Sequence, residues 1–259
     1  MKALLLTAPS RLEFVDFPEP QPADGEVVVK VHACGICGSD IHGWDGSSGR
    51  RNAPLIMGHE ASGEIVATGP SVKKWRAGDR VTFDSTIYCG ACAYCRAGQV
   101  NLCESRRVVG VSPAEYKQHG AFAERLAIPE RILYRLPDTL PYDQAAMVEP
   151  VSIAIHAVQR TKIAPNSTAV VIGSGMIGLL VIQALRWAGA EQVVQAVGLH
   201  GQVSFSSARK RCSCAATWAG CCMGNRWPAP GSTWCTAACG GGTSAMISSL
   251  CAGGHRVSC

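Results

Sequence analysis

The stretch Gly35-Ile36-Cys37-Gly38-Ser39-Asp40-Ile41-His42, followed by Gly58-His59-Glu60, places a thiol, two imidazoles, two carboxylates and a hydroxyl close together in the sequence. Zinc binds cysteine sulfur, histidine nitrogen and carboxylate oxygen, and a catalytic zinc site keeps one position open for water or substrate. Cys37 and His59 are therefore predicted zinc ligands, and Glu60 is the candidate third.

Ser39 and His42 complete this constellation on the substrate side. A hydroxyl and an imidazole can pass a proton outward from a bound alcohol. The alternative interpretation of the same residues is a buried thiol with two hydrogen-bonded core histidines.

The segments on either side of this motif are typical of a β-rich domain. Residues 27–33 and 64–68 have strand character and lie near glycine or proline, and residues 77–83 form a turn leading into another strand. Short strands at this spacing favour a small barrel over a βαβ array.

A second cysteine pattern, C-x2-C-x2-C-x7-C, follows the β-rich segments and comprises Cys89, Cys92, Cys95 and Cys103. Four thiolates in one loop can surround a tetrahedral ion and leave no site for a substrate, so this pattern predicts a structural zinc. An iron–sulfur cluster accepts the same four ligands. Disulfides are the third option, and the absence of an export signal argues against them.

Residues 137–159 are predicted to connect two modules. Residues 142–147 have the pattern of a helical turn, which Glu149-Pro150 would interrupt, and residues 151–158 could form a helix carrying His156. Glu149 is interpreted either as a surface carboxylate at a helix end or as a carboxylate presented toward the zinc.

Beyond this connection the pattern changes to that of an α/β domain. Thr168–Ile172 is a largely apolar run, as expected of a buried parallel strand, and Gly173-Ser174-Gly175-Met176-Ile177-Gly178 follows directly. A helix is predicted over residues 176–188, and a second strand begins at residues 192–194. A G-x-G-x-x-G motif between strand and helix predicts that this backbone binds the pyrophosphate of a dinucleotide. An ordinary tight turn is the alternative.

Together, and in this order, these motifs resemble the zinc-dependent medium-chain dehydrogenase/reductase family, which includes alcohol, sorbitol and threonine dehydrogenases. The resemblance covers residues 1 to about 195. It implies a GroES-like β-barrel catalytic domain over residues 1–150 and the start of a Rossmann domain, a doubly wound parallel sheet, over residues 151–195, with the active site in the cleft between them. Glu149 stands where alcohol dehydrogenase has a second cysteine ligand, which resembles the polyol-dehydrogenase pattern.

The resemblance implies oxidation of a secondary alcohol, such as a polyol, a sugar-alcohol phosphate or threonine. A catalytic zinc on Cys37, His59 and either Glu149 or Glu60 would activate the alcohol, whose proton would leave through Ser39 and His42. The hydride would pass to NAD or NADP. A homodimer or homotetramer is expected of the intact family member. The alternatives are an inactive fragment that retains zinc binding, and a zinc-free quinone reductase of the same superfamily.

The resemblance stops near Gln195, and no Asp or Glu follows Glu191 to hold the adenosine ribose. Residues 196–259 contain eight cysteines and three tryptophans, without a countable apolar period. We interpret them as an aberrant tail arising from a reading-frame error, and expect them to be largely disordered. A genuine metal-binding or redox appendage is the alternative.

The charge and hydropathy patterns bear on partners and location. The net charge of +5 comes entirely from residues 196–259, which hold five basic residues and no acidic one, so it does not indicate a nucleic-acid partner. No apolar run reaches about 18 residues, which indicates no membrane span. The N-terminus lacks the pattern of a secretory signal, and we expect a cytoplasmic protein.

Overall fold

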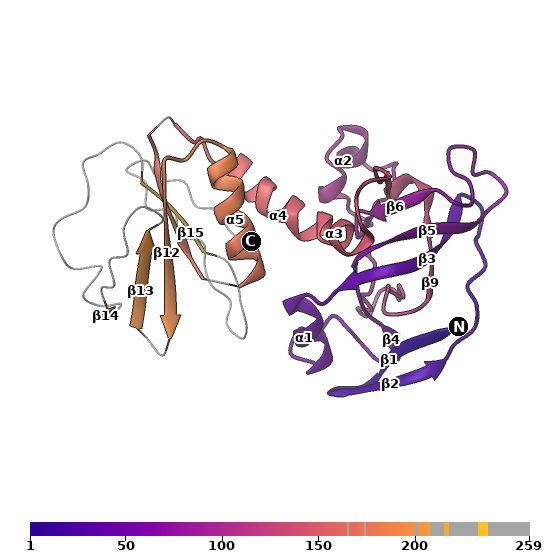
Figure 1. Ribbon diagram of the computed structural model, residues 1–259. Helices are drawn as coiled ribbons and strands as arrows, with labels where there is room; N and C mark the ends of the chain where they lie inside the picture. The colour runs from indigo at the N-terminus through magenta and orange to yellow at the C-terminus, as the bar shows by residue number, and fades with distance from the viewer. Residues whose placement is uncertain (165, 174, 200–201, 208–214, 218–232, 238–259) are drawn as a thin grey trace. The chain divides into compact units, whose positions relative to one another are not determined.

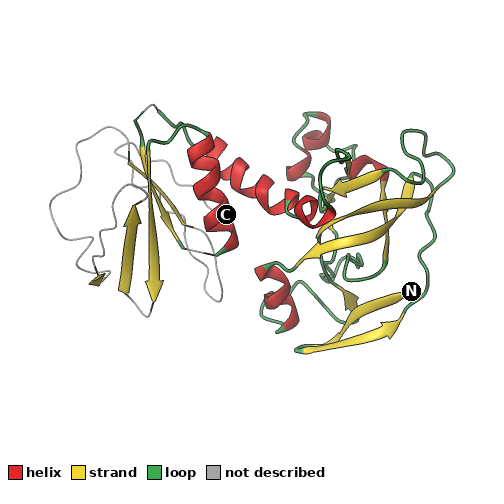
Figure 2. Ribbon diagram, in the orientation of Figure 1, coloured by secondary structure: helices red, strands yellow, loops and turns green. Residues whose placement is uncertain are grey.

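The structure, a computed structural model, describes residues 1–164, 166–173, 175–199, 202–207, 215–217 and 233–237. It divides into two units, Met1–Glu149 and Pro150–Cys259, which are described separately below. Figures 1 and 2 show that strands dominate the first unit, and that the second combines helices with a sheet. The tail expected from the sequence falls largely outside the described residues, so its disorder and the three-part domain division remain predictions.

The first unit is built on a five-stranded antiparallel sheet of order β10-β6-β5-β3-β9. Its strands are β3 (Glu26–Gly35), β5 (Glu60–Thr68), β6 (Arg80–Phe83), β9 (Arg125–Pro129) and β10 (Leu133–Arg135). β-Branched side chains suit this pleated surface, and Val27, Val29, Ile65 and Val81 belong to the main hydrophobic core. This sheet holds β3 beside β5, the two strands that flank the predicted zinc motif.

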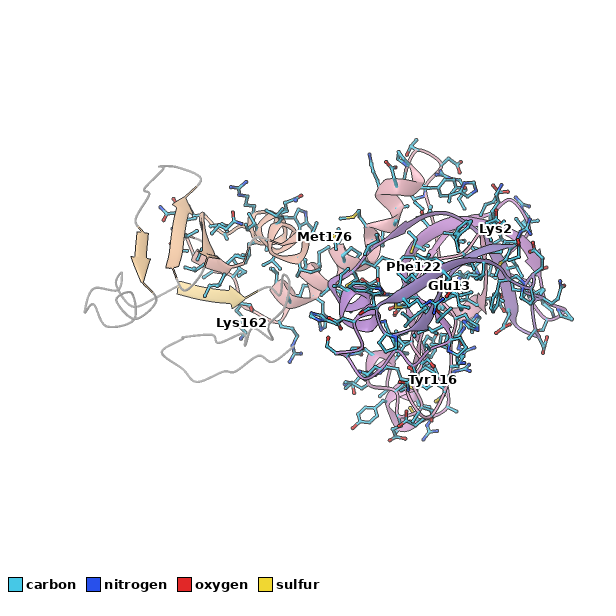
Figure 3. The ribbon with its side chains drawn as sticks, turned by 90° about the horizontal axis from the view of Figure 1, so that it is seen from below. Lys2, Glu13, Tyr116, Phe122, Lys162 and Met176 are labelled. Carbon is cyan, nitrogen blue, oxygen red and sulfur yellow. The ribbon has the colours of Figure 1, made fainter. Side chains whose placement is uncertain are left out.

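A three-stranded sheet accompanies it, in the order β2-β1-β4. It comprises β1 (Lys2–Ala8), β2 (Arg11–Asp16) and β4 (Leu55–Ile56). The segment around Phe122, which Figure 3 shows among the strands of the first unit, connects the two sheets: the Leu4 amide donates to the Phe122 carbonyl, and Ala3 bridges to Ala123. Among the described strands no continuous ladder closes a barrel, because β1 pairs with this segment through an isolated bridge and with no strand of the large sheet.

Shorter elements complete the first unit. They are α1 (Gly38–Trp44), β7 (Thr86–Ile87), α2 (Ala93–Arg96), η1 (Val100–Leu102), β8 (Arg107–Val108), η2 (Glu130–Ile132) and α3 (Tyr142–Ala146). The β7–β8 pair lies in the sequence on either side of the segment that carries the four cysteines.

The connection between the units differs from the sequence prediction. α3 ends at Ala146, and α4 (Val148–Gln159) begins two residues later, so the break falls at Met147 and not at Glu149-Pro150. Pro150 lies in the first turn of α4, where its missing N–H costs no helical hydrogen bond and its fixed φ suits the helix. Glu149 therefore sits at the start of a helix.

The second unit contains a strand–turn–helix–strand arrangement. β11 (Thr168–Ile172) leads into α5 (Met176–Trp187), and β12 (Gln192–Leu199) then pairs with β11 in parallel. The parallel pairing, the helix and the second strand confirm the sequence prediction for this region. Its core gathers small and branched side chains, among them Val158, Val171, Val181 and Leu185.

Further strands extend this sheet to the order β14-β13-β12-β11-β15. β15 (Thr233–Ala237) pairs with β11 in parallel, whereas β13 (Gln202–Ser207) and β14 (Ala215–Thr217) are antiparallel additions. Within the part of the chain that the structure describes, no helix is both long and apolar enough to cross a bilayer.

Candidate metal centre and active site

Cys37, His59 and Glu60 come together because β3 pairs with β5. In this antiparallel ladder Gly35 lies opposite Glu60, so the residues that follow β3 meet those that begin β5. One ligand atom from each of the three side chains lies within 4.8 Å of the other two. His59 and Glu60 are buried, and Cys37 is half-buried. The geometry is thus that of a compact donor set of sulfur, nitrogen and oxygen, as a zinc ion requires.

Two glycines make room for this donor set. A Cβ at Gly35 would lie 2.4 Å from the Glu60 Oε2 atom, and a Cβ at Gly58 would lie 2.5 Å from the Phe122 ring. Gly58 also has a φ of +90°, in the region that side-chain-bearing residues avoid. Gly35 and Gly58 are therefore explained by close packing, whereas a Cβ at Gly38 would meet nothing within 4 Å.

Asp40 braces two of the predicted ligands, a role that the sequence prediction did not assign to it. Its Oδ1 lies 3.5 Å from His59 Nδ1, and its Oδ2 accepts a hydrogen bond of 3.0 Å from the Cys37 backbone N–H. Burial alone would raise the pKa of Asp40, but the adjacent imidazole of His59 and the charge of Arg51 hold that pKa below its ordinary value. Asp40 is thus a carboxylate that orients the imidazole, with His59 Nε2 left for a metal.

The electrostatics of the donor set favour a cation. Burial lowers the pKa of His59, but Asp40 and Cys37 outweigh it and raise that pKa to about 10. A pKa raised this far indicates that negative charge surrounds the imidazole, and a bound divalent cation would balance that charge. The residues present therefore fit a zinc ion.

Arg51 is a second residue that the sequence prediction missed. Its side chain is 7% exposed, and its Nη2 donates a 3.0 Å hydrogen bond to Ser39 Oγ and lies 3.5 Å from Asp40 Oδ1. Ser39 Oγ is in turn 3.5 Å from His59 Nε2. An arginine in a polar loop gives no sequence signal of burial, so only the tertiary structure reveals it.

His42 lies on the same helix as Ser39, three residues further on. Side chains at this spacing share one helix face. The Nδ1 atom of His42 is 3.2 Å from Ser47 Oγ, which leaves Nε2 as the other ring nitrogen for a proton relay.

Glu149 lies close to the donor set without belonging to its most compact group. Its pKa is raised, first by burial and then by the charge of Glu60, although the charge of His59 opposes the shift. Its Oε1 accepts a hydrogen bond of 3.4 Å from Ser85 Oγ. Glu60 has a raised pKa as well, again with burial as the largest cause. A buried carboxylate, Glu60, and a half-buried one, Glu149, thus accompany Cys37 and His59.

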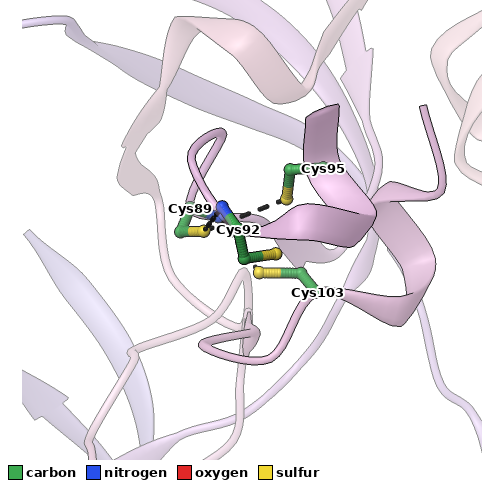
Figure 4. A group of neighbouring side chains, drawn as sticks. All are labelled: Cys89, Cys92, Cys95 and Cys103. Atoms are coloured by element: carbon green, nitrogen blue, oxygen red, sulfur yellow. Dashed lines mark hydrogen bonds between the residues drawn. The ribbon is translucent and has the colours of Figure 1, made fainter. Parts of the chain in front are cut away.

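The four cysteines of the second pattern converge in a separate lobe (Figure 4). One sulfur from each of Cys89, Cys92, Cys95 and Cys103 lies within 4.8 Å of the others, and all four are free thiols. The backbone N–H groups of Ala91 and Cys92 donate to Cys89 Sγ and lower its pKa to about 6. A loop that stabilises thiolate in this way fits a four-sulfur metal site.

Comparison with known proteins agrees with this geometry. Residues 23–138 match the alcohol dehydrogenase GroES-like domain. The chain is 36% identical over 197 residues to sorbitol dehydrogenase of Bacillus subtilis (strain 168), covering 75% of this chain and 55% of that protein. It is 38% identical over 194 residues to D-arabitol-phosphate dehydrogenase of Enterococcus avium, covering 73% and 54%.

A solved alcohol dehydrogenase from Escherichia coli CFT073, complexed with NADH, superimposes with a TM-score of 0.68 at 34% identity, covering 75% of this chain and 56% of that chain. Residues 23–138 of this chain belong to the alcohol dehydrogenase GroES-like domain family. The expected fold class, a GroES-like domain followed by the start of a Rossmann domain, is confirmed, apart from the barrel closure noted above. The chain spans about half the length of the curated relatives it matches.

The glycine motif of this chain forms the predicted turn before α5. Gly173 has a φ of +106°, Gly175 caps the helix and Met176 begins it. Gly178 is buried and Ile177 packs against the core of the second unit, so these two positions serve helix packing. Ser174 lies outside the described residues.

Proposed function

We propose that this chain provides the zinc-binding part and the first nucleotide-binding motif of a secondary-alcohol dehydrogenase. The substrate would be a polyol, a sugar-alcohol phosphate or a threonine-type amino alcohol, and NAD or NADP would accept the hydride. The observation that carries the proposal is the compact donor set of Cys37, His59 and Glu60, with Ser39 beside it. The sorbitol and D-arabitol-phosphate dehydrogenases among its relatives support the polyol class.

The zinc ion would supply Lewis-acid polarisation of the alcohol when bound. Cys37 and His59 would hold it with Glu60, whose carboxylate lies in the compact group, and Glu149 is the alternative third ligand. The four-cysteine lobe would hold a second, structural zinc, a role supported by its four converging sulfurs.

The protein's own residues would handle the proton. Ser39 Oγ would accept it from the alcohol hydroxyl and donate its own proton onward, and His42, on the same helix face, would carry it toward solvent.

The remaining parts of the proposal concern cofactor, assembly and location. The turn from Gly173 to Gly178 would bind the pyrophosphate at the N-terminus of α5, where backbone amides favour an anion. A homodimer or homotetramer of the intact protein, and a cytoplasmic location, are further proposals that rest on the family and on the free thiols of the described cysteines.

The test is metal analysis of the chain as given, and turnover with NAD or NADP and a panel of polyols by a chain whose reading frame is restored after residue 195. In that restored chain Cys37→Ala should remove one of two zinc ions and all turnover, whereas His42→Ala should keep both metals and slow proton release, most visibly below neutral pH. Two zinc ions with no turnover would instead identify an inactive zinc-binding fragment. The absence of zinc would favour the zinc-free quinone reductases of the superfamily.

A further inference from the structure

The proton path proposed above does not include Arg51. The buried guanidinium of Arg51 nevertheless donates a hydrogen bond to Ser39, which belongs to that path. Its nearest polar contact is Ser39 Oγ at 3.0 Å, closer than Asp40 Oδ1 at 3.5 Å. Its Nε atom is buried without a hydrogen-bond partner among the described residues, so Arg51 is held there at an electrostatic cost. A surface position would avoid that cost, which suggests a role at the site.

The fold reserves space for this side chain. Gly43 lies on α1 directly after His42, and a Cβ at position 43 would lie only 1.9 Å from Arg51 Cδ. Any larger residue at position 43 would push the arginine stem away from Ser39. The helix that carries Ser39 and His42 is thus shaped around Arg51.

The hydrogen-bonding capacity of the two groups fixes the direction of their contact. A guanidinium has only donors, whereas a serine hydroxyl has one donor and two acceptor sites. Ser39 must therefore accept from Arg51, which leaves one acceptor site and the hydroxyl proton for other partners. Accepting a proton from an alcohol and donating one onward needs this remaining pair.

We propose that Arg51 is a positioning residue that orients the Ser39 hydroxyl. By donating to Ser39 Oγ, it leaves Ser39 free to accept a proton from the alcohol and to donate its own proton away from Arg51. The inference rests on the proposed function, because it assigns a direction to the relay at the same site. Arg51 acts through Ser39 and does not itself touch the reacting atoms. The competing explanation is that Arg51 only balances the charge of Asp40.

A double-mutant cycle on the full chain separates these explanations. The protein is loaded with cobalt(II), and binding of butane-2,3-diol is followed through the visible absorption of the cobalt at the Cys37 site. Arg51→Met should weaken diol binding about tenfold, the loss typical of one hydrogen bond to a charged group, and leave cobalt affinity close to that of the wild type. In a Ser39→Ala background the same substitution should have no further effect.

Two further variants serve as controls. Arg50→Met removes a positive charge from the exposed neighbouring residue and should bind the diol like the wild type. Arg51→Lys keeps a charge opposite Asp40 but lacks the planar fork, so it should fold and bind cobalt normally yet recover diol binding only in part. Cobalt bound at the four-cysteine lobe reports in every variant that the chain has folded.

The outcomes are distinct. Additive losses from Arg51→Met and Ser39→Ala, or full recovery by Arg51→Lys, would overturn the role of Arg51 in orienting Ser39. Loss of cobalt from the Cys37 site in Arg51→Met, in both backgrounds, would show that Arg51 serves Asp40 alone. If the wild-type protein binds cobalt at both sites and its cobalt spectrum does not change when the diol is added, the proposed function is wrong. The role of Arg51 is then wrong as well.

Discussion

Asp40 Oδ1 lies 3.5 Å from His59 Nδ1, and the same carboxylate accepts the backbone N–H of Cys37 through Oδ2 at 3.0 Å. One buried side chain therefore contacts two predicted zinc ligands, His59 at ion-pair distance and Cys37 through a hydrogen bond. A carboxylate on one ring nitrogen orients the imidazole and increases the basicity of the other nitrogen. The arrangement gives Asp40 a testable part in metal binding, although it is not itself in the donor set.

Asp40→Asn should lower the affinity of the Cys37 site for zinc by about 10- to 100-fold, the range found when an outer partner of a metal ligand is removed. Competition with a chelator measures this affinity. Asp45→Asn provides the control, because Asp45 caps the same helix and is exposed. Equal zinc affinity in the wild type and in Asp40→Asn would contradict the role of Asp40.

Cys103→Ser should remove one of the two zinc ions and lower the melting temperature, because metal binding at a structural site is part of the folding free energy. Zinc content and thermal unfolding are measured together. Cys34→Ser is the control: Cys34 belongs to neither group of converging donor atoms, so both zinc ions should remain. An unchanged metal content in Cys103→Ser would rule out zinc in the four-cysteine lobe.

A side chain at positive φ costs about 1–3 kcal/mol, and Gly58→Ala should destabilise the first unit by more than this. The added Cβ would also collide with the Phe122 ring next to His59. Gly78→Ala is a matched control, since Gly78 has the same φ of +90° and no atom within 4 Å of the added Cβ. Urea unfolding should show the larger loss for Gly58→Ala, and equal losses would contradict the packing argument.

The acid sensitivity of the protein should depend in part on His119. Its Nδ1 accepts a 3.2 Å hydrogen bond from the Ile56 backbone N–H, and burial, with a smaller contribution from Lys117, lowers its pKa. The folded state thus favours the neutral ring, so this contribution to stability is present above the ordinary pKa of about 6.5 and is lost as pH falls below it.

His119→Asn keeps an acceptor for the Ile56 amide and removes the titration. Its free energy of unfolding should therefore fall less steeply than that of the wild type between about pH 7 and pH 5. Urea titrations at several pH values measure this slope. Identical slopes in the two proteins would show that His119 does not contribute to acid sensitivity.

NAD should bind this chain weakly or not at all, because no Asp or Glu follows Glu191 to hold the adenosine ribose. Calorimetric titration beside limited proteolysis tests this. Micromolar binding together with a protease-resistant core extending past residue 220 would show that residues 196–259 are native, and that the reading-frame interpretation is wrong.

Local spacing in the sequence was sufficient to predict the elements whose chemistry is local. The four cysteines lie within one short loop, so their spacing alone predicts that the sulfurs converge. The glycine motif from Gly173 to Gly178 is likewise local: it follows β11 directly, and its last three residues begin α5, as predicted. Pattern reasoning misplaced the helix break near Glu149 because a proline can begin a helix as readily as end one.

Only the tertiary structure decided the contacts that depend on pairing across the chain. The register of β3 against β5 sets Gly35 opposite Glu60, and so places Glu60 with Cys37 and His59. The burial of Arg51 depends on the absence of a side chain at Gly43. Such contacts arise from strand register and side-chain packing between distant segments, and residue type and spacing along the chain do not encode these distances.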